Sequence, residues 1–409
     1  MLTELRLDDP ALIADPYPYY AWLRDDAPVH RCAQPDVWLV SRHDDVVAVL
    51  RDPRRFASDV LRVTGSIQGS PFNPALRVPP VVARAVARNT WLRVLLTSDP
   101  PEHTVLRRKV SRAFTPRMMT TWEQRIRVIA DEQVAALVRA AAGGPVDLVT
   151  GVASPLPTRV IAEMMAIPPR RQADFKRWSD WLVGGLLTGG SVPRLLAAAA
   201  EISLFFARTV RVRRRRPGDD LVSLLVAGDE DEALSSAELV AFCVLLLVAG
   251  NETTTNLISN AVLALDARPE VRRRLVADPS LAARVVEETL RYDGPGQGLI
   301  RATTGDVEIA GVNIPARSLV MPLIGSANRD PRRWSEPDRF DIDRQGMDHL
   351  AFGTGLHYCL GQALARLEAR IVLETLFRAA PGLRVAGEPD RIPSPVLRGL
   401  RRLPVRVSG

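Results

Sequence analysis

Residues 352–361 read Phe352-Gly353-Thr354-Gly355-Leu356-His357-Tyr358-Cys359-Leu360-Gly361, which places one cysteine among three glycines. Glycine adopts backbone angles that other residues avoid and lets a flat partner approach the main chain closely. After Gly361 the chain continues Gln-Ala-Leu-Ala-Arg-Leu-Glu-Ala-Arg, a strong helix pattern. The stretch predicts that Cys359 lies on a tight loop before a helix N-terminus, where N–H groups and the helix dipole favour an anionic sulfur. Such a thiolate binds soft or borderline metals, and these residues alone leave several metals open.

The same stretch resembles the heme-binding loop of the cytochrome P-450 family, the heme-thiolate monooxygenases. The family pattern is Phe-x-x-Gly-x-x-x-Cys-x-Gly, with a basic residue two positions before the cysteine. The matching residues here are Phe352, Gly355, His357, Cys359 and Gly361. The resemblance implies that Cys359 is the axial ligand of the iron in heme b. It also implies that Phe352 packs near the sulfur and that Gly353 belongs to the cofactor-binding loop.

A basic pair follows the segment Ser98-Asp99-Pro100-Pro101-Glu102. An aspartate cap with proline in the first turn predicts a helix that starts directly after Asp99. His103 and Arg107 are four residues apart and share one face of that helix. The pair alone also fits ordinary surface charge. In the cytochrome P-450 family, a His and an Arg at this place contact the heme propionates, and the surrounding Asp-Pro-Pro-Glu-His match implies that role.

A long apolar helix is predicted from the capping-box pattern Ser235-Ser236-Ala237-Glu238 to about Leu265, roughly 45 Å in length. Its middle reads Ala249-Gly250-Asn251-Glu252-Thr253-Thr254-Thr255, where glycine, threonines and a carboxylate are costly inside an apolar helix. A kinked helix with a satisfied carboxylate is one interpretation. The segment also resembles the family's Ala-Gly-x-Asp/Glu-Thr-Thr motif, which implies that Thr253 holds a water molecule and that Glu252 relays protons from solvent.

Glu288 and Arg291 form a Glu-x-x-Arg pattern, whose two members can pair on one helix face. The pattern alone is weak evidence, because surface helices contain many such pairs. The resemblance implies that Arg339, from the segment before the cysteine loop, joins them in a buried charge network. The expected role of this network is structural, since it would position the loop that carries Cys359.

Arg301 follows an irregular segment that lines the substrate pocket in the family, and it is expected to bind a heme propionate together with His103, Arg107 and His357. Gln297 in that segment is either a polar group near the substrate or a turn residue. The other candidate pocket residues are aliphatic: Val244, Leu245, Val248, Ala249, Leu299, Ile300, Val396 and Leu397. They predict a bulky hydrophobic substrate, with a terpenoid or steroid favoured over a polyketide or fatty acid. Residues 61–90 are expected to form a loop that covers the substrate.

The composition is ordinary for a soluble globular protein, with 409 residues of which 46 % are hydrophobic and 25 % charged. No repeat or linker divides the chain, so we expect residues 1–409 to form one domain. Three cysteines, Cys32, Cys243 and Cys359, are too few for a disulfide framework, which indicates a reducing cytoplasm. The N-terminus has no signal-peptide core, and the longest apolar run, residues 239–249, is shorter than the roughly 20 residues of a membrane span. We therefore expect a cytoplasmic monomer without a membrane anchor.

The net charge of +7 comes from arginines that are spread along the chain. They are not interleaved with aromatic residues, which argues against nucleic-acid binding. A basic face that docks an acidic protein is a better interpretation, and the candidates for it are Arg108, Lys109, Arg112, Arg366 and Arg370. No flavin or iron–sulfur pattern appears in the sequence. Electrons are therefore expected from a separate ferredoxin and its NAD(P)H-dependent reductase.

Together the motifs predict a mainly α-helical (α+β) fold with small β-sheets, the cytochrome P-450 fold, with heme between the long helix and the helix after Cys359. The implied reaction is monooxygenation, in which one atom of O2 enters a C–H or C=C bond of the substrate and the other leaves as water. Two alternatives share the cysteine loop: a peroxide-driven heme-thiolate peroxygenase and a non-catalytic heme-binding sensor. Neither needs the Glu252–Thr253 pair. A substrate tethered to a carrier protein is also compatible with the sequence.

Overall fold

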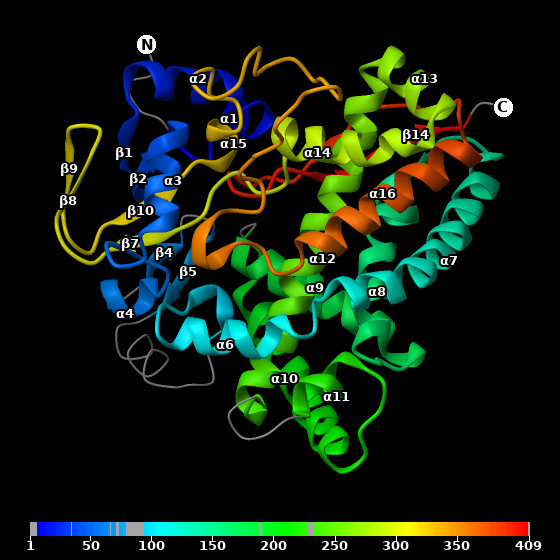
Figure 1. The fold of residues 1–409 in the computed structure, drawn as a ribbon, viewed down its shortest axis with the longest axis horizontal. Helices are drawn as coiled ribbons and strands as arrows, with labels where there is room; N and C mark the ends of the chain where they lie inside the picture. Colours follow the sequence, from blue (N-terminus) through cyan, green and yellow to red (C-terminus); the bar gives the residue numbers. More distant parts are fainter. Residues whose placement is uncertain are drawn as a thin grey trace.

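The computed structural model describes residues 6–33, 35–65, 67–70, 73–78, 94–187, 190–227 and 233–407. As predicted, the fold is mainly helical with small β-sheets (Figure 1). Much of the predicted substrate-covering loop at 61–90 lies outside the described residues. The helices are α1 (Pro10–Ala14), α2 (Tyr17–Asp26), α3 (His43–Arg51), α4 (Val60–Thr64), α6 (Glu102–Ser111), α7 (Pro116–Ala141), α8 (Pro155–Met164), α9 (Gln172–Leu187), α10 (Val192–Arg215), α11 (Leu221–Val226), α12 (Ser236–Asp266), α13 (Pro269–Ala277), α14 (Ala282–Asp293), α15 (Ile324–Ala327) and α16 (Gln362–Ala379). A short helical turn, η6 (Gly355–His357), lies inside the cysteine loop.

A five-stranded mixed sheet lies at one side of the helices, with strand order β1-β2-β10-β7-β3 (Figure 1). The strands of the fold are β1 (Val29–Ala33), β2 (Asp36–Val40), β3 (Phe56–Ala57), β4 (Ile67–Ser70), β5 (Asn73–Val78), β6 (Val146–Asp147), β7 (Arg301–Thr303), β8 (Val307–Ile309), β9 (Val312–Ile314), β10 (Leu319–Pro322), β11 (Arg384–Val385), β12 (Asp390–Arg391), β13 (Leu400–Arg402) and β14 (Pro404–Arg406). Strands β3 and β7 are antiparallel, and Ala57 opposes Ala302. The next pair in that register is Ser58 and Arg301, so both residues lie at the same end of the sheet.

Helix α12 is the central element of the fold. It begins with the predicted capping box, in which Ser235 Oγ accepts a bond from the Glu238 N–H and the Glu238 carboxylate accepts one from the Ser235 N–H. Helices α8, α9, α10, α14 and α16 pack against it, and Figure 1 shows it passing through the middle of the molecule. Among the described helices it is the one long and apolar enough to cross a membrane. Because other helices surround it, we interpret it as the core helix.

Helix α6 begins later than the sequence predicts, at Glu102 instead of directly after Asp99. The Asp99 carboxylate does not cap the helix but accepts bonds from the Ser58 and Asp59 N–H groups, at 2.8 and 3.0 Å. The two residues after Asp99 are prolines, which have no N–H to offer to a cap. Asp99 therefore ties the start of α6 to the chain that leaves β3.

A buried ion pair on α14 holds the chain that leads to the cysteine loop. The Glu288 and Arg291 side chains are both 0 % exposed, and hydrogen bonds of 2.7 and 2.8 Å join them. Arg291 also donates to the backbone carbonyls of Asn328, Pro337 and Arg339. One guanidinium thus fixes two stretches of backbone between α15 and the loop, as the sequence predicted for this pair.

The sequence predicts Arg339 as the third charged residue of this network, but Arg344 occupies that place in the structure. Arg344 Nε lies 3.6 Å from Glu288 Oε1, and the Arg344 side chain is mostly buried. The Arg339 side chain is exposed and pairs with Glu336, so Arg339 contributes only its carbonyl oxygen. The next residue, Phe340, is buried in the core, so the chain here alternates between an exposed and a buried side chain.

We expect Glu288→Gln to lower the free energy of unfolding by about 3–5 kcal/mol, because it leaves the buried Arg291 guanidinium without its counter-charge. The matched control is Arg339→Ala, which removes an exposed side chain and should change stability by less than about 0.5 kcal/mol. Urea unfolding followed by far-ultraviolet circular dichroism measures both. Equal stability of the two variants would contradict the network as described.

Candidate heme-thiolate site

The cysteine loop is closed by a hydrogen bond of 2.9 Å from the Cys359 N–H to the Phe352 carbonyl. Gly353 and Gly355 have φ angles of 71° and 70°, in the left-handed region that side chains rarely adopt. At Gly355 a Cβ atom would also lie 3.1 Å from the carbonyl oxygen of Leu50 in α3. Glycine is therefore needed at these two positions, because the loop turns tightly while packing against α3.

Cys359 lies just before α16, which begins at Gln362 as predicted. Burial raises the pKa of the Cys359 thiol, whereas a hydrogen bond from the Gly361 N–H and the charges of Arg107 and Arg366 oppose the rise. A bound metal cation removes the proton of a coordinating thiol outright. The described part of the chain contains no group of three or more His, Cys, Asp or Glu side chains that could hold a metal.

Side chains of α14 and α16 brace the loop through Phe352. The Arg366 guanidinium lies 4.4 Å from the centroid of the Phe352 ring. Arg366 also donates to Glu287 of α14 at 2.6 Å, and His349 Nε2 lies 3.2 Å from the same carboxylate. Burial alone raises the pKa of Glu287, but the bonds from His349 and Arg366 outweigh it and lower this pKa to about 2. Glu287 is thus an anion that ties both helices to the loop.

Four basic side chains, all predicted from the sequence, gather next to the loop: His103 and Arg107 of α6, Arg301 of β7 and His357 of η6. The ring centroids of His103 and His357 are 4.2 Å apart. His357 Nε2 lies 2.9 Å from Ser58 Oγ, which the pairing of β3 with β7 places beside Arg301. We call these four side chains the basic cluster.

The pKa of each side chain in the basic cluster is lowered, because its surroundings destabilise the charged form. Burial, followed by the charges of Arg301, His103 and Arg107, lowers the pKa of His357 to about 3. Burial lowers the pKa of Arg301 to about 10, and it is also the main cause of the lowered pKa values of His103 and Arg107. His103 is 1 % exposed, and neither of its ring nitrogens has a hydrogen-bond partner within the described ranges. Anionic carboxylates, such as the two propionates of heme, fit a cluster with these needs.

The middle of α12 presents an open face although most of the helix is buried. Ala249 is exposed, Glu252 and Thr253 are half-buried, and Thr253 Oγ1 donates to the Ala249 carbonyl at 2.7 Å. Burial raises the pKa of Glu252, with the charge of Lys176 opposing this and that of Asp180 adding to it. A carboxyl with a raised pKa retains its proton closer to neutral pH, which suits proton relay. The relay itself remains a prediction.

Asn251, to which the sequence analysis gave no role, links this turn to two other helices. Its Nδ2 donates to Ser179 Oγ of α9 at 3.0 Å, and its Oδ1 accepts from Thr158 Oγ1 of α8 at 2.8 Å. Asn251 is 1 % exposed, so both bonds are shielded from water. They hold the turn of Glu252 against α9, the helix that carries Lys176 and Asp180.

Several candidate pocket residues meet in one apolar cluster. Val396 and Leu397 are buried together with Val183 of α9, and Val248 of α12 and Ile300 pack against them. We call these five side chains the apolar wall. Four of these side chains were predicted as pocket residues from three separate stretches of the sequence: Val248, Ile300, and the pair Val396 and Leu397. Val183 was not predicted.

Other candidate pocket residues pack elsewhere. Leu299 packs against the cluster beneath the sheet, because neighbouring side chains of an extended chain point to opposite sides. Val244 and Leu245 are half-buried on α12 and pack against the main core. Their contact with substrate stays a prediction.

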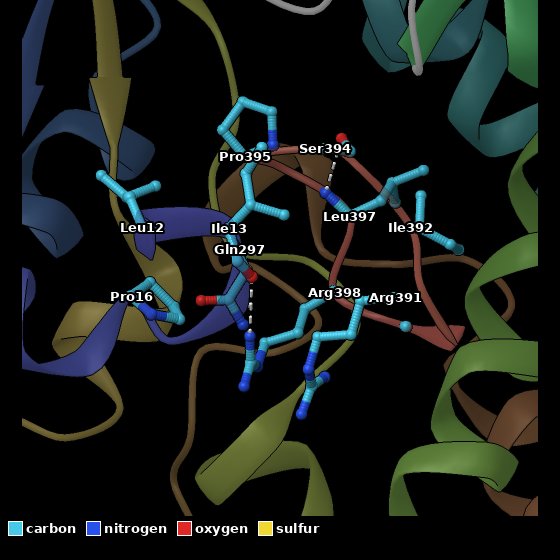
Figure 2. Close-up of a pocket in the computed structure, with 11 residues that line it drawn as sticks. Leu12, Ile13, Pro16, Gln297, Arg391, Ile392, Ser394, Pro395, Leu397 and Arg398 are labelled. Carbon is cyan, nitrogen blue, oxygen red and sulfur yellow. Dashed lines mark hydrogen bonds between the residues drawn. The ribbon is translucent and has the colours of Figure 1, made fainter. Parts of the chain in front are cut away.

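Gln297 is buried beside a small cavity between α1 and the C-terminal loop (Figure 2). Its Nε2 donates to the Gly294 carbonyl at 2.8 Å, and its backbone N–H donates to the Val396 carbonyl at 2.9 Å. The cavity measures about 10 Å³, enough for about one water molecule. Gln297 thus stabilises a turn, and a contact with substrate also stays a prediction.

Two buried charged residues near the site, Arg344 and Glu368, were missed by the sequence analysis. Glu368 lies on the buried stripe of α16 between Leu364 and Ile371. The spacing of that stripe is readable in the sequence, so a carboxylate within it was an available signal. Arg344 lies in an irregular segment, where no periodicity marks a side chain as buried.

Comparison with known proteins finds relatives that match nearly the full length of the chain. The model of the family described as Cytochrome P-450 matches residues 200–379. The chain is 40 % identical over 407 residues to cytochrome P-450 107B1 of Saccharopolyspora erythraea, covering 97 % of this chain and 96 % of that protein. It is 40 % identical over 399 residues to vitamin D(3) 25-hydroxylase of Pseudonocardia autotrophica, covering 96 % and 93 %. It is 36 % identical over 416 residues to 6-deoxyerythronolide B hydroxylase of Saccharopolyspora erythraea, covering 100 % of both.

Solved structures agree with the fold. CYP109Q5 from Chondromyces apiculatus superposes with a TM-score of 0.87 at 38 % identity, covering 100 % of this chain and 99 % of the other. CYP109E1 from Bacillus megaterium in complex with testosterone gives 0.82 at 35 % identity, covering 97 % and 100 %. The fold and the cysteine loop thus define a heme-thiolate oxidoreductase. The chain belongs to the cytochrome P-450 family: it is a monooxygenase with a heme iron cofactor.

We expect His103→Phe and Arg301→Leu each to speed heme loss by about tenfold to a hundredfold. The reason is that each variant removes a hydrogen bond to an ionised propionate, which is worth about 1.5–3 kcal/mol. The matched control is Arg54→Leu, at an exposed arginine that follows α3. The rate of heme transfer to excess apomyoglobin, followed by the Soret absorbance, measures this. Unchanged rates in both variants would remove the basic cluster from heme binding.

Proposed function

We propose that this monooxygenase inserts one atom of O2 into a bulky, steroid-like hydrophobic molecule, with electrons from a separate ferredoxin and heme b as the cofactor. The observation that carries the proposal is the placement of Glu252 and Thr253 on the open face of α12, where a carboxyl of raised pKa lies beside a hydroxyl. A peroxide-driven peroxygenase or a heme-binding sensor would need neither group. The pair therefore favours activation of O2, which consumes protons.

Bound heme would supply an iron atom that binds O2 and passes electrons to it. Cys359 would hold that iron, and the basic cluster would bind the propionates. Thr253 donates its own hydroxyl hydrogen to the Ala249 carbonyl, so its oxygen lone pairs are left to accept a hydrogen bond from water. Glu252 would take up protons on the α9 side and pass them to that water. The apolar wall would hold the substrate and keep other water away from the reacting oxygen.

Thr253→Ala tests the proton role. We expect it to lower the ratio of product formed to NADPH consumed by at least about tenfold, because positioned proton transfer contributes about a hundredfold and water can replace part of it. Turnover driven by added hydrogen peroxide should change little, since that oxidant brings its own protons. Thr253→Ser, which keeps the hydroxyl, is the control. Normal coupling in Thr253→Ala would favour the peroxygenase or sensor alternative instead.

The apolar wall supports a steroid-like substrate. It consists of aliphatic side chains, which match an apolar molecule without charged groups. One relative is named a vitamin D(3) 25-hydroxylase, and one similar structure contains testosterone. Another relative is named a 6-deoxyerythronolide B hydroxylase, so a macrolactone is the strongest competing substrate.

A spectral titration decides between these substrate classes. Displacement of water from ferric heme by a fitting substrate shifts the Soret band to shorter wavelength. We expect testosterone or vitamin D3 to produce this shift with a Kd at least about tenfold below that of 6-deoxyerythronolide B or palmitate, a difference of about 1.4 kcal/mol. Tighter binding of the macrolactone or the fatty acid would overturn the steroid assignment.

Fewer basic residues are available to dock a ferredoxin than the sequence indicates. Arg366 pairs with Glu287, and Arg370 pairs with two glutamates, Glu123 and Glu374. Lys109 donates to the Ala233 carbonyl, and Arg112 donates to the Leu224 carbonyl. Arg108 is exposed on α6, the helix that contacts the cysteine loop through His103 and His357. Of the five candidates, Arg108 therefore has the most uncompensated charge for a partner.

Exposed apolar side chains of the cysteine loop extend this surface. Leu356 is 40 % exposed and Tyr358 is 38 % exposed, although both belong to the loop that carries Cys359. Arg51 of α3, also exposed, donates to Thr354 Oγ1 at 3.1 Å and so lies beside them. An apolar centre with cations at its edge suits an acidic electron-transfer protein.

We expect NADPH-driven turnover with a plant-type [2Fe–2S] ferredoxin and its reductase to fall at least about threefold between about 50 and 300 mM salt, because salt screens the attraction between opposite surface charges. Arg108→Glu should weaken the reaction at low salt, whereas Arg211→Glu, on the exposed face of α10, should not. Turnover that ignores both salt and Arg108→Glu would count against this surface.

We also assign the protein to the cytoplasm. The chain has only three cysteines, Cys32, Cys243 and Cys359, which suits a reducing compartment. The relatives named above are bacterial proteins that match nearly the whole chain. The monomeric state stays a prediction.

A further inference from the structure

A groove of about 630 Å³ lies on residues that the heme site does not use. It is lined by residues of α1 and α2, by the ends of α12 and α14, and by two arginines near the C-terminus, Arg391 and Arg398. Pro18 and Ala267, which also line it, are exposed, so the groove opens to solvent. Its volume suits a small molecule, since ligand sites measure about 300–1,000 Å³. None of these lining residues belongs to the cysteine loop, the basic cluster or the apolar wall.

Arginine and tyrosine side chains of this groove stack on one another. The guanidinium carbon of Arg329 lies 3.4 Å from the centroid of the Tyr17 ring and 3.6 Å from that of Tyr292. The two centroids are 6.5 Å apart, so this guanidinium lies between the rings. Arg268 also stacks on Tyr292, at 4.9 Å from the ring centroid. Contacts of this kind hold the cations in place before a ligand binds, which lowers the entropy cost of binding.

The groove carries a net positive charge, because four arginines and three aspartates line it. Two of the aspartates are used in ion pairs. Asp338 pairs with Arg329 at 3.1 Å. Asp293 is buried and pairs with Arg398. The third, Asp15, is exposed to water. The excess of one cation over the acids matches a ligand with a single negative charge.

Arg391 lacks a partner for part of its guanidinium. Its Nη1 atom is buried and has no hydrogen-bond partner in the part of the chain that the structure describes. Figure 2 shows Arg391 next to Arg398. Burial, followed by the charge of Arg398, lowers the pKa of Arg391, although the charges of Asp293 and Asp15 oppose this. An anion in the groove would bind the unused donor and offset the repulsion between the two arginines.

Small apolar side chains form most of the remaining lining of the groove. They are Ala14, Pro18, Ala21, Leu263, Ala264 and Ala267. The alanines leave space beside the arginines, and none of the six side chains can form a hydrogen bond. The groove thus combines a cation that lacks an anion with a surface that favours contact with hydrocarbon.

We propose that this groove is a binding site for an apolar monocarboxylate, separate from the site of the oxygen reaction. The carboxylate pairs with the Arg391 guanidinium, where Nη1 is the unused donor, and the charge of Arg268 adds to the attraction. The hydrocarbon part lies against the alanines. A phosphate dianion exceeds the net charge of the groove, whereas a neutral alcohol leaves Arg391 without an anion. Because the ligand contacts segments from both ends of the chain, its binding stabilises the fold.

Calorimetric titration of the holoenzyme with octanoate tests the site. A bulky azole, clotrimazole, is bound to the heme iron during the titration so that the heme site is filled. We expect octanoate to bind with a Kd at least about tenfold below those of octanol and inorganic phosphate, because octanoate alone offers both a charged hydrogen-bond acceptor and an apolar chain. Octanoate binding that disappears when the azole is present would overturn the proposal. Equally tight binding of octanol or phosphate would do the same.

Variants of the groove locate the bound octanoate. Arg391→Leu should weaken binding at least about tenfold, because it removes a charged hydrogen bond, and Arg391→Lys should restore part of the affinity. Ala267→Trp fills the groove from an exposed position without a change of charge, and it should also weaken binding. The matched control is Arg273→Leu, at an exposed arginine of α13 that does not line the groove.

Octanoate should also raise the melting temperature of the wild type with the azole bound, but not that of Arg391→Leu. An unaltered Soret band and melting temperature without octanoate show that the variants are folded. Unchanged octanoate affinity in both Arg391→Leu and Ala267→Trp would overturn the proposal. No turnover is measured, so these results do not depend on the proposed function.

Discussion

The buried ion pair between Glu288 and Arg291 fixes the chain on which the thiolate depends. Arg291 binds three backbone carbonyls, and Glu288 also accepts a bond from the Asp341 N–H, so the irregular segment after α15 has a defined path. Asn328, one of the residues bound, in turn accepts the Leu350 N–H through its side chain, directly before the cysteine loop. A buried pair of this kind adds little net stability, but either charge left alone is very costly. The contribution of this ion pair is to hold the chain before the cysteine loop in place and so to position Cys359.

The cysteine loop alone would fit several metal cofactors. The basic cluster adds binding groups for a cofactor that carries carboxylates. Burial and the neighbouring cations lower the pKa values of His103 and His357, and His103 has no protein partner for its ring within the described residues. The arrangement becomes favourable when anionic groups lie between them, while the thiol requires a metal within reach of its sulfur. A planar metal complex with two carboxylates meets both needs. In the middle of α12, a carboxyl and a hydroxyl replace the apolar residues of a core helix. In the proposed function, Cys359 would hold the iron, the basic cluster would bind the propionates and the turn of Glu252 would supply protons.

The parts that the sequence predicted are those with local signals. The capping box at Ser235, the glycines around Cys359 and the helix after Gly361 act over a few residues, and each was found where expected. One error arose where a distant part of the chain competes, because Asp99 binds the chain after β3 instead of capping α6. The other lies in an irregular segment without periodicity, where Arg344 takes the place expected of Arg339. Glu368 was not predicted to be buried, although the apolar spacing of α16 places it on the buried face of that helix. The contacts of the pocket residues needed the fold, since Leu299 and Ile300 face different clusters.

In the proposed function, Cys359 holds the heme iron as a thiolate, in a loop fixed by the surrounding charges. Reduction of the holoenzyme under carbon monoxide tests this, because a thiolate ligand shifts the Soret band of the reduced carbon monoxide complex strongly to the red. We expect this red-shifted band in the wild type and its loss in Cys359→Ser, with the same far-ultraviolet circular dichroism in both proteins. A red-shifted band that survives in Cys359→Ser, or its absence from the well-folded wild type, would show that Cys359 does not hold the iron as a thiolate.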